Sequence, residues 1–178
     1  PQAAMADVAH AVQPRQVRIY EGGGPRILVI DTGCKESIVA SLRQRGAAVV
    51  RAPADSAWEP YVDHCDGVLL GNGPGDPKDL PALCDRVRAL FSARGGSLPL
   101  FGICLGHQLL ARAAGADTYK LPFGHRSHNQ PVIDLLSRRA YVTSQNHGYA
   151  VDTATLPADF APWFENLNDG TNEGLRHR

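Results

Sequence analysis

A cysteine flanked by glycines is the strongest candidate for chemistry in this sequence. Cys104 stands in the run Gly102-Ile103-Cys104-Leu105-Gly106, between an apolar stretch and a segment with helical spacing. A nucleophile between two small residues at a strand-to-helix junction is typical of a nucleophile elbow, a sharp turn that holds a reactive side chain exposed. The start of the following helix favours a thiolate, and its N–H groups can stabilise an oxyanion. Taken alone, the pattern fits a small buried thiol before an ordinary helix equally well.

A second cysteine competes for the role of nucleophile. Cys34 also lies between an apolar strand and a helical segment, with Lys35 beside it. It lacks the second small residue that an elbow needs, so Cys104 is the better candidate. The two other cysteines, Cys65 and Cys84, are predicted to be structural thiols. Because no Cys or Cys/His spacing matches a structural zinc site, no metal is predicted.

Two further segments carry groups that could recognise a polar substrate. Residues 71–77 (GNGPGDP) form a stiff loop whose glycines allow close approach of backbone N–H groups, although a tight structural turn is the simpler interpretation. Residues 144–149 (SQNHGY) end a predicted strand with four hydrogen-bonding side chains, which would suit an amide or a carboxylate. Gln108, in the helix after Cys104, offers both a donor and an acceptor.

The elements that must position these segments alternate between strands and helices. Apolar runs typical of strands buried on both faces occupy residues 27–30, 47–50, 67–70 and 98–103, and segments with helical spacing occupy 37–45, 79–93 and 105–114. This alternation predicts an α/β fold with a mostly parallel sheet and helices on both faces. Ligands of such sheets bind beyond the carboxyl ends of the strands, where the loops at 31–34, 71–77 and 102–108 lie.

The helical signal fades after Gly115. Residues 131–136 and 140–145 are predicted to form a β-hairpin around 137–139, and residues 168–171 (NDGT) are predicted to form a turn between further extended pieces. The basic segment 120–128 is interpreted as a solvated loop or a partner contact.

Composition limits the classes of protein to which this chain can belong. Among 178 residues, 18 Lys and Arg balance 18 Asp and Glu, so no nucleic acid or anionic membrane is expected as the main partner. A hydrophobic content of 43% excludes disorder along the whole length. The sequence has neither a membrane-length apolar run nor a secretory pattern, and a cytoplasmic protein is predicted.

Residues 1–24 are interpreted as a linker from an absent upstream domain, and residues 25–178 as one domain, incomplete at its C-terminus.

Four segments together closely resemble the class I glutamine amidotransferase domain of glutamine-dependent carbamoyl-phosphate synthase. They are residues 71–77, 102–108, 124–131 and 144–151. The elbow is shared by many class I amidotransferases, whereas residues 146–149 (NHGY) and 168–174 point to the carbamoyl-phosphate branch. The resemblance runs from about residue 25 to the last residue. It implies a class I glutamine amidotransferase-like, flavodoxin-like fold whose mostly parallel sheet carries helices on both faces and a β-hairpin extension.

The resemblance also implies a reaction and the residues that perform it. Cys104 would attack the side-chain amide of L-glutamine, form a glutamyl thioester and release ammonia. The backbone N–H groups of Leu105 and of the loop at Gly75 would hold the oxyanion. The positions that match the family's glutamine-binding residues are Gly73, Gly75, Leu105, Gln108, Asn146, Gly148 and Tyr149.

Ammonia would then pass to a synthetase partner that uses ATP and magnesium to join it to activated bicarbonate, for pyrimidine or arginine synthesis. This domain itself is expected to hold no cofactor. Two alternatives stay open. One is another class I amidotransferase, such as the anthranilate synthase component, and the other is a non-catalytic regulatory module that acts on a synthetase.

The resemblance does not extend to the family's general base, and this lowers the activity expected of the chain. The family's base His and its orienting Glu belong to a His-Pro-Glu element, a tripeptide that does not occur in these 178 residues. His177 follows Cys104 in the expected order but has no Pro-Glu after it. Removal of a catalytic His slows amide hydrolysis severely. Glutamine turnover by this chain alone is therefore expected to be lower than normal enzyme rates by a factor on the order of 10³–10⁶.

Overall fold

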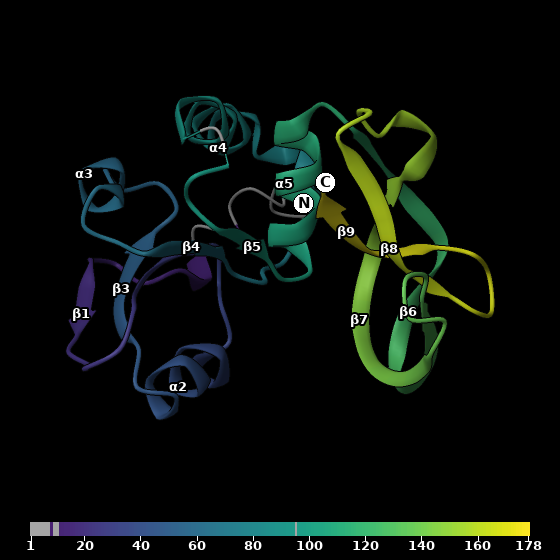
Figure 1. Ribbon diagram of the computed structural model, residues 1–178, viewed down its shortest axis with the longest axis horizontal. Coiled ribbons are helices and arrows are strands. Elements are labelled where there is room, and N and C mark those ends of the chain that lie inside the picture. Colours follow the sequence, from purple (N-terminus) through teal and green to yellow (C-terminus); the bar gives the residue numbers. More distant parts are fainter. Residues whose placement is uncertain (1–7, 9–10, 95) are drawn as a thin grey trace. The chain divides into compact units, whose positions relative to one another are not determined.

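The computed structural model describes residue 8, residues 11–94 and residues 96–178 (Figure 1). The chain divides into two compact units, Pro1–Leu110 and Ala111–Arg178. Of the predicted linker 1–24, residues 1–7, 9 and 10 lie outside the described residues. Within the described part, no helix combines the length and the apolar character that a membrane span requires.

The first unit is built on a five-stranded sheet. Its strands, in the order in which they pair, are β1 (Arg18–Tyr20), β3 (Ala48–Pro53), β2 (Arg26–Asp31), β4 (Gly67–Leu70) and β5 (Leu100–Gly102). Strands β2, β3, β4 and β5 pair in parallel, and β1 adds to the edge of β3 in the antiparallel sense. The predicted mostly parallel sheet is therefore confirmed. Its central strand is buried on both faces, since Leu28, Val29 and Ile30 are each fully buried.

Helices cover both faces of this sheet. They are α2 (Glu36–Gln44), α3 (Glu59–Val62), the 3₁₀ turn η1 (Pro77–Asp79), α4 (Pro81–Arg94) and α5 (Leu105–Ala114). Figure 1 shows α2 on one face of the sheet and α3 and α4 on the other. The chain therefore leaves the neighbouring strands β2 and β4 toward opposite faces, and the crevice at the carboxyl ends of such a strand pair is where open α/β sheets bind ligands.

The second unit is an antiparallel sheet. Its strands pair in the order β7 (Ala140–Asp152), β6 (Asp117–Asp134), β8 (Phe160–Asn166) and β9 (Asn172–His177), and the 3₁₀ turn η2 (Thr153–Thr155) follows β7. The predicted hairpin is confirmed, with Arg138 at φ 59° in its turn. The turn at 168–171 is also confirmed, because it joins β8 to β9 with Gly170 at φ 72°.

The interpretation of residues 120–128 as a solvated loop is wrong. The segment belongs to β6, and Leu121 and His125 within it are buried. Its pairing with β7 shifts register between Lys120 and His125 and again between Ser127 and Gln130. Because each shift resets the alternation of buried and exposed side chains, the period of two that identifies a strand is lost from the sequence.

A candidate active site at a strand-to-helix elbow

Cys104 sits in a strained turn between β5 and α5. Strand β5 ends at Gly102 and helix α5 begins at Leu105, so the chain reverses direction within two residues. The backbone of Cys104 has φ 54°, in the left-handed region, which costs a residue with a side chain about 1–2 kcal/mol. The thiol residue is half-buried. Strain of this kind at a reactive side chain is what an elbow requires, so the predicted turn is confirmed, while the role of Cys104 as nucleophile stays a prediction.

The two flanking glycines make this turn possible. A Cβ on Gly102 would lie 2.5 Å from the carbonyl carbon and oxygen of Gly106, and one on Gly106 would lie 2.1 Å from the carbonyl oxygen of Leu70. Hydrogen bonds hold the same close approach, because Ile103 N–H donates to Leu70 O over 3.0 Å and Gly106 N–H donates to Gly71 O over 3.1 Å. The elbow is therefore packed backbone-to-backbone on the end of β4, where no side chain fits.

The glycine-rich loop after β4 lies directly beside the elbow. A Cβ on Gly73 would meet the carbonyl oxygen of Thr32 at 2.5 Å and Cδ2 of Leu105 at 2.9 Å. Gly75 has φ 108°, a conformation that a side chain disfavours. The fold thus brings Gly73 against Leu105, the residue that follows Cys104.

Backbone donors gather at the start of α5. Leu105 is the first residue of the helix, so no carbonyl oxygen within the helix can accept a hydrogen bond from its N–H group. The first helical hydrogen bond runs from Gln108 N–H to Cys104 O over 3.1 Å, and Gln108 is buried. An anion that forms next to the Cys104 sulfur would therefore meet the positive end of the α5 dipole.

Cys34 lies in a different environment. It is buried, its thiol faces the Lys35 carbonyl oxygen at 3.7 Å, and its backbone N–H donates to Oδ1 of Asp31. Burial and the nearby charge of Asp31 raise the pKa of the Cys34 thiol to about 11. Since the thiolate is the reactive form, this residue is a poor nucleophile at neutral pH.

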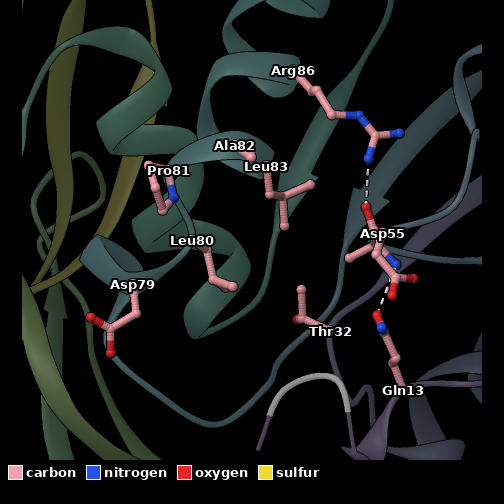
Figure 2. Close-up of a pocket in the computed structure, with 10 residues that line it drawn as sticks. Gln13, Thr32, Asp55, Asp79, Leu80, Pro81, Ala82, Leu83 and Arg86 are labelled. Atoms are coloured by element: carbon pink, nitrogen blue, oxygen red, sulfur yellow. Dashed lines mark hydrogen bonds between the residues drawn. The ribbon is translucent and has the colours of Figure 1, made fainter. Parts of the chain in front are cut away.

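A cavity of about 290 Å³ opens in the same unit, next to the carboxyl ends of β2 and β3 (Figure 2). Its lining is mainly apolar, and Arg86 on its wall is already engaged: Nη1 donates to Ala54 O over 2.8 Å, and the guanidinium pairs with Glu59. The described residues that line it include neither cysteine nor histidine, so this cavity supplies no nucleophile.

The remaining predicted glutamine-binding residues belong to the second unit. Asn146, Gly148 and Tyr149 lie on β7, where Asn146 pairs with Arg126 and Tyr149 pairs with Lys120. The predicted site residues thus form two groups, one in each unit. Their part in glutamine binding stays a prediction.

One cluster of side chains in the second unit was not predicted from the sequence. His125, His147 and Glu173 lie together in the fold, although 22 and 26 residues separate them along the chain. His177 stands apart from this cluster, with Nε2 3.4 Å from Oδ2 of Asp159 and its ring edge-on to Phe160. No local spacing could have identified the cluster, because strands β6, β7 and β9 each contribute one member.

Comparison with known proteins points to one family. The family model "Glutamine amidotransferase class-I" matches residues 28–178. The chain is 51% identical over 152 residues to the carbamoyl phosphate synthase arginine-specific small chain of Neosartorya fischeri, a match that covers 85% of this chain and 33% of that protein. It is 49% identical over 158 residues to the carbamoyl phosphate synthase small chain of Symbiobacterium thermophilum, covering 88% of this chain and 43% of that protein.

A solved structure shows the same fold. The glutamine amidotransferase from Thermotoga maritima superposes with a TM-score of 0.69 at 20% identity, covering 86% of this chain and 71% of that one. The predicted fold class is therefore confirmed. The chain spans about a third to two fifths of the length of the two carbamoyl phosphate synthase chains.

Proposed function

This chain belongs to the class I glutamine amidotransferase family, and on that basis we propose that it is the glutaminase part of a carbamoyl-phosphate synthase small chain. It would hydrolyse L-glutamine to glutamate and ammonia. One observation carries the proposal: Cys104 is held at φ 54° between two glycines that have no room for a side chain. The names of the relatives, which are about half identical to this chain, supply the carbamoyl-phosphate branch.

In the proposed reaction, the sulfur of Cys104 acts first as the nucleophile and later as the leaving group. The thiolate attacks the side-chain carbonyl carbon of glutamine, and the electron pair of the C=O bond moves to oxygen. Collapse of this intermediate breaks the C–N bond, the NH2 group takes up a proton from water and leaves as ammonia, and a glutamyl thioester remains. Water then attacks the thioester, which releases glutamate and returns the thiol.

The groups around Cys104 supply electrostatic stabilisation. The N–H of Leu105, at the positive end of α5, and the backbone of the loop at Gly75 would hold the oxygen that becomes negative. Loss of one such donor typically costs about 10²–10³ in rate. Gln108, Asn146, Gly148 and Tyr149 would bind the rest of the glutamine, as in the family.

The proposed partner is the synthetase of the same complex. The relatives are named as small chains, which supports a larger subunit that receives the ammonia. ATP and magnesium would act in that subunit, and this domain would need no cofactor of its own.

Covalent labelling tests the nucleophile. The purified chain is treated with a diazo-ketone analogue of glutamine, and the modified peptide is identified by mass spectrometry. We expect one label per chain, at Cys104, and protection by glutamine. The Cys104→Ser variant should lose the label, whereas the matched Cys34→Ser variant should keep it. A label at Cys34, or labelling that glutamine does not slow, would refute the assignment.

Transfer of ammonia tests the branch of the family. The complete small chain is combined with a carbamoyl-phosphate synthetase subunit and, separately, with an anthranilate synthase component. Glutamine-dependent formation of carbamoyl phosphate alone is expected. Formation of anthranilate would favour the other amidotransferase branch, and failure of both with an intact label at Cys104 would favour the regulatory module.

A further inference from the structure

Three side chains from three strands converge in the second unit. His125 on β6, His147 on β7 and Glu173 on β9 each present one ligand atom, and these atoms all lie within 4.8 Å of one another. Nδ1 of His125 is 3.0 Å from Oε1 of Glu173, and Nε2 of His147 is 3.2 Å from Oε2 of the same carboxylate. All three side chains are about nine-tenths buried, at 9%, 12% and 11% exposure.

The other nitrogen of each imidazole is held by an acceptor. Nε2 of His125 lies 2.8 Å from Oδ2 of Asp169, and Nδ1 of His147 lies 2.9 Å from the carbonyl oxygen of Tyr149. Histidines that bind metal ions almost always donate their second N–H to a carboxylate or a backbone carbonyl, which fixes the tautomer and aims the free lone pair. Both histidines have this arrangement, and each aims its remaining nitrogen at Glu173.

Further side chains complete the shell. Oε1 of Gln145 lies 2.8 Å from Nδ1 of His125 and 3.2 Å from Nε2 of His147, so a neutral oxygen adjoins both imidazole nitrogens. The buried amide of Asn166 donates to Gln130 and lies 3.4 Å from Oε1 of Glu173. In tetrahedral zinc sites the metal–ligand distances of about 2.0–2.2 Å place the donor atoms about 3.3 Å apart. The separations of 2.8–3.2 Å that join Gln145 and Glu173 to the two imidazoles are close to that value, and the three ligand atoms all lie within 4.8 Å of one another.

We propose that His125, His147 and Glu173 form a binding site for a divalent transition-metal ion of the Zn²⁺ class. Two imidazoles and one carboxylate are a ligand set that zinc prefers, and imidazole also suits the other late first-row ions. Binding would tie β6, β7 and β9 together at one point, and β7 is the strand that carries Asn146 and Tyr149. The test of this site measures metal binding and not glutamine hydrolysis, so its outcome is separate from that of the proposed glutaminase activity.

A proton on His125 competes with the metal. Burial alone would lower the pKa of His125, but its hydrogen bonds to Asp169 and Gln145, together with the charges of Asp169 and Glu173, outweigh burial and raise the pKa. Metal binding is therefore measured at pH 8, where less of this competing proton remains.

Calorimetric titration of the untagged chain tests the site. The protein is stripped with a chelator, dialysed and titrated with Zn²⁺ at pH 8. We expect one ion per chain, with a dissociation constant in the micromolar range or tighter. The ligand variants His125→Asn and Glu173→Gln should each weaken binding by about 100-fold or more. Asp169→Asn, which removes only the partner of His125, should weaken it by about 10–100-fold.

A neighbouring histidine provides the matched control. His128 lies on the same strand, is exposed and contacts Oγ of Ser144, so His128→Asn should leave zinc binding unchanged. Absence of binding by the unaltered chain would overturn the proposal, as would equal affinities of His125→Asn and the unaltered chain. An equal loss in His128→Asn would identify surface histidines as the binding groups and would overturn it too.

Cobalt serves as a second measurement that needs no variant. Circular dichroism without metal shows whether His125→Asn and Glu173→Gln are folded. If they are not folded, the visible absorption of Co²⁺ bound to the unaltered chain tests the proposed site instead. Intense visible absorption, typical of a four-coordinate site, supports the cluster as the site, and the weak spectrum of octahedral Co²⁺ overturns it.

Discussion

Two junctions in the first unit have the same place in the topology but different chemistry. Cys34 follows β2 and precedes α2, and Cys104 follows β5 and precedes α5. Both thiols thus lie where parallel strands end and ligands bind. Yet Cys34 is buried with a pKa of about 11, whereas Cys104 is half-buried in a strained left-handed turn.

The two junctions are stabilised by different interactions. At the first, buried Asp31 accepts hydrogen bonds from Gly33 N–H and Cys34 N–H and pairs with Arg51, which also reaches Glu36. At the second, the backbone of Gly106 packs on Leu70 with no side chain between them. The same topological position thus holds a buried thiol beside a charged network in one case, and a half-buried thiol on tightly packed backbone in the other.

The largest effect is expected from removing the charge that organises the first junction. Asp31→Ala leaves Arg51 buried without its main partner, which should lower the free energy of unfolding by about 3–5 kcal/mol in urea titrations. The matched change Glu36→Gln removes the exposed partner of the same arginine and should cost less than about 1 kcal/mol. Similar losses for both variants would show that the buried pair has no special role.

A methyl group at the second junction should be nearly as damaging. Gly106→Ala places a Cβ 2.1 Å from Leu70 O, an overlap that backbone movement must relieve, so we expect a loss of about 3 kcal/mol or more in unfolding free energy. Gly23→Ala is the control, because no atom lies within 4 Å of its added Cβ, and it should change stability by less than about 0.5 kcal/mol. A loss below about 1 kcal/mol in Gly106→Ala would contradict the packing argument.

The raised pKa of Cys34 predicts a steep pH dependence of its alkylation. With a pKa of about 11, about one Cys34 thiol in 10³ is ionised at pH 8, so iodoacetamide should modify it about two orders of magnitude more slowly than a free cysteine. The rate should rise about tenfold per pH unit from pH 8 to pH 10. Timed alkylation with peptide mass spectrometry measures it, and the denatured chain is the control. A rate that is independent of pH would rule out the protonated, buried thiol.

The smallest effect concerns strain at Cys104. Alanine is ordinarily more stabilising than glycine, but at φ 54° the order should reverse. Cys104→Gly is therefore expected to be more stable than Cys104→Ala by about 1 kcal/mol in thermal or urea unfolding. At Cys34, whose φ is not positive, Cys34→Ala should be more stable than Cys34→Gly. The same order at both positions would mean that the elbow is not strained.

Much of the first unit could be predicted from the sequence because its signals are local. The apolar run at 67–70 coincides with β4, and the helical spacing of 105–114 coincides with α5. The glycines around Cys104 mark the turn, since only they permit its close backbone contacts. The predicted strand at 98–103 shortens to Leu100–Gly102, and the helix predicted at 79–93 begins at Pro81, because the ends of elements depend on their neighbours.

Prediction failed where pairing between distant strands determines the structure. Residues 120–128 form a strand only because β7 pairs with them across two register shifts. The cluster of His125, His147 and Glu173 was not predicted because the three residues are far apart in the sequence and form no local motif. Local patterns carry no information about which side chains three separate strands will bring together.

The amino-acid sequence was sufficient to predict the turn at Cys104 and the alternation of strands and helices, since each depends on residues that are close in the chain, and its four short motifs were sufficient for the family resemblance. Only the folded chain shows that Cys34 lies in an apolar core cluster beside the charge of Asp31, and that two histidines and a carboxylate meet in the second unit. The physical reason is that burial and electrostatic environment are properties of contacts, and those contacts join residues that lie far apart in the sequence.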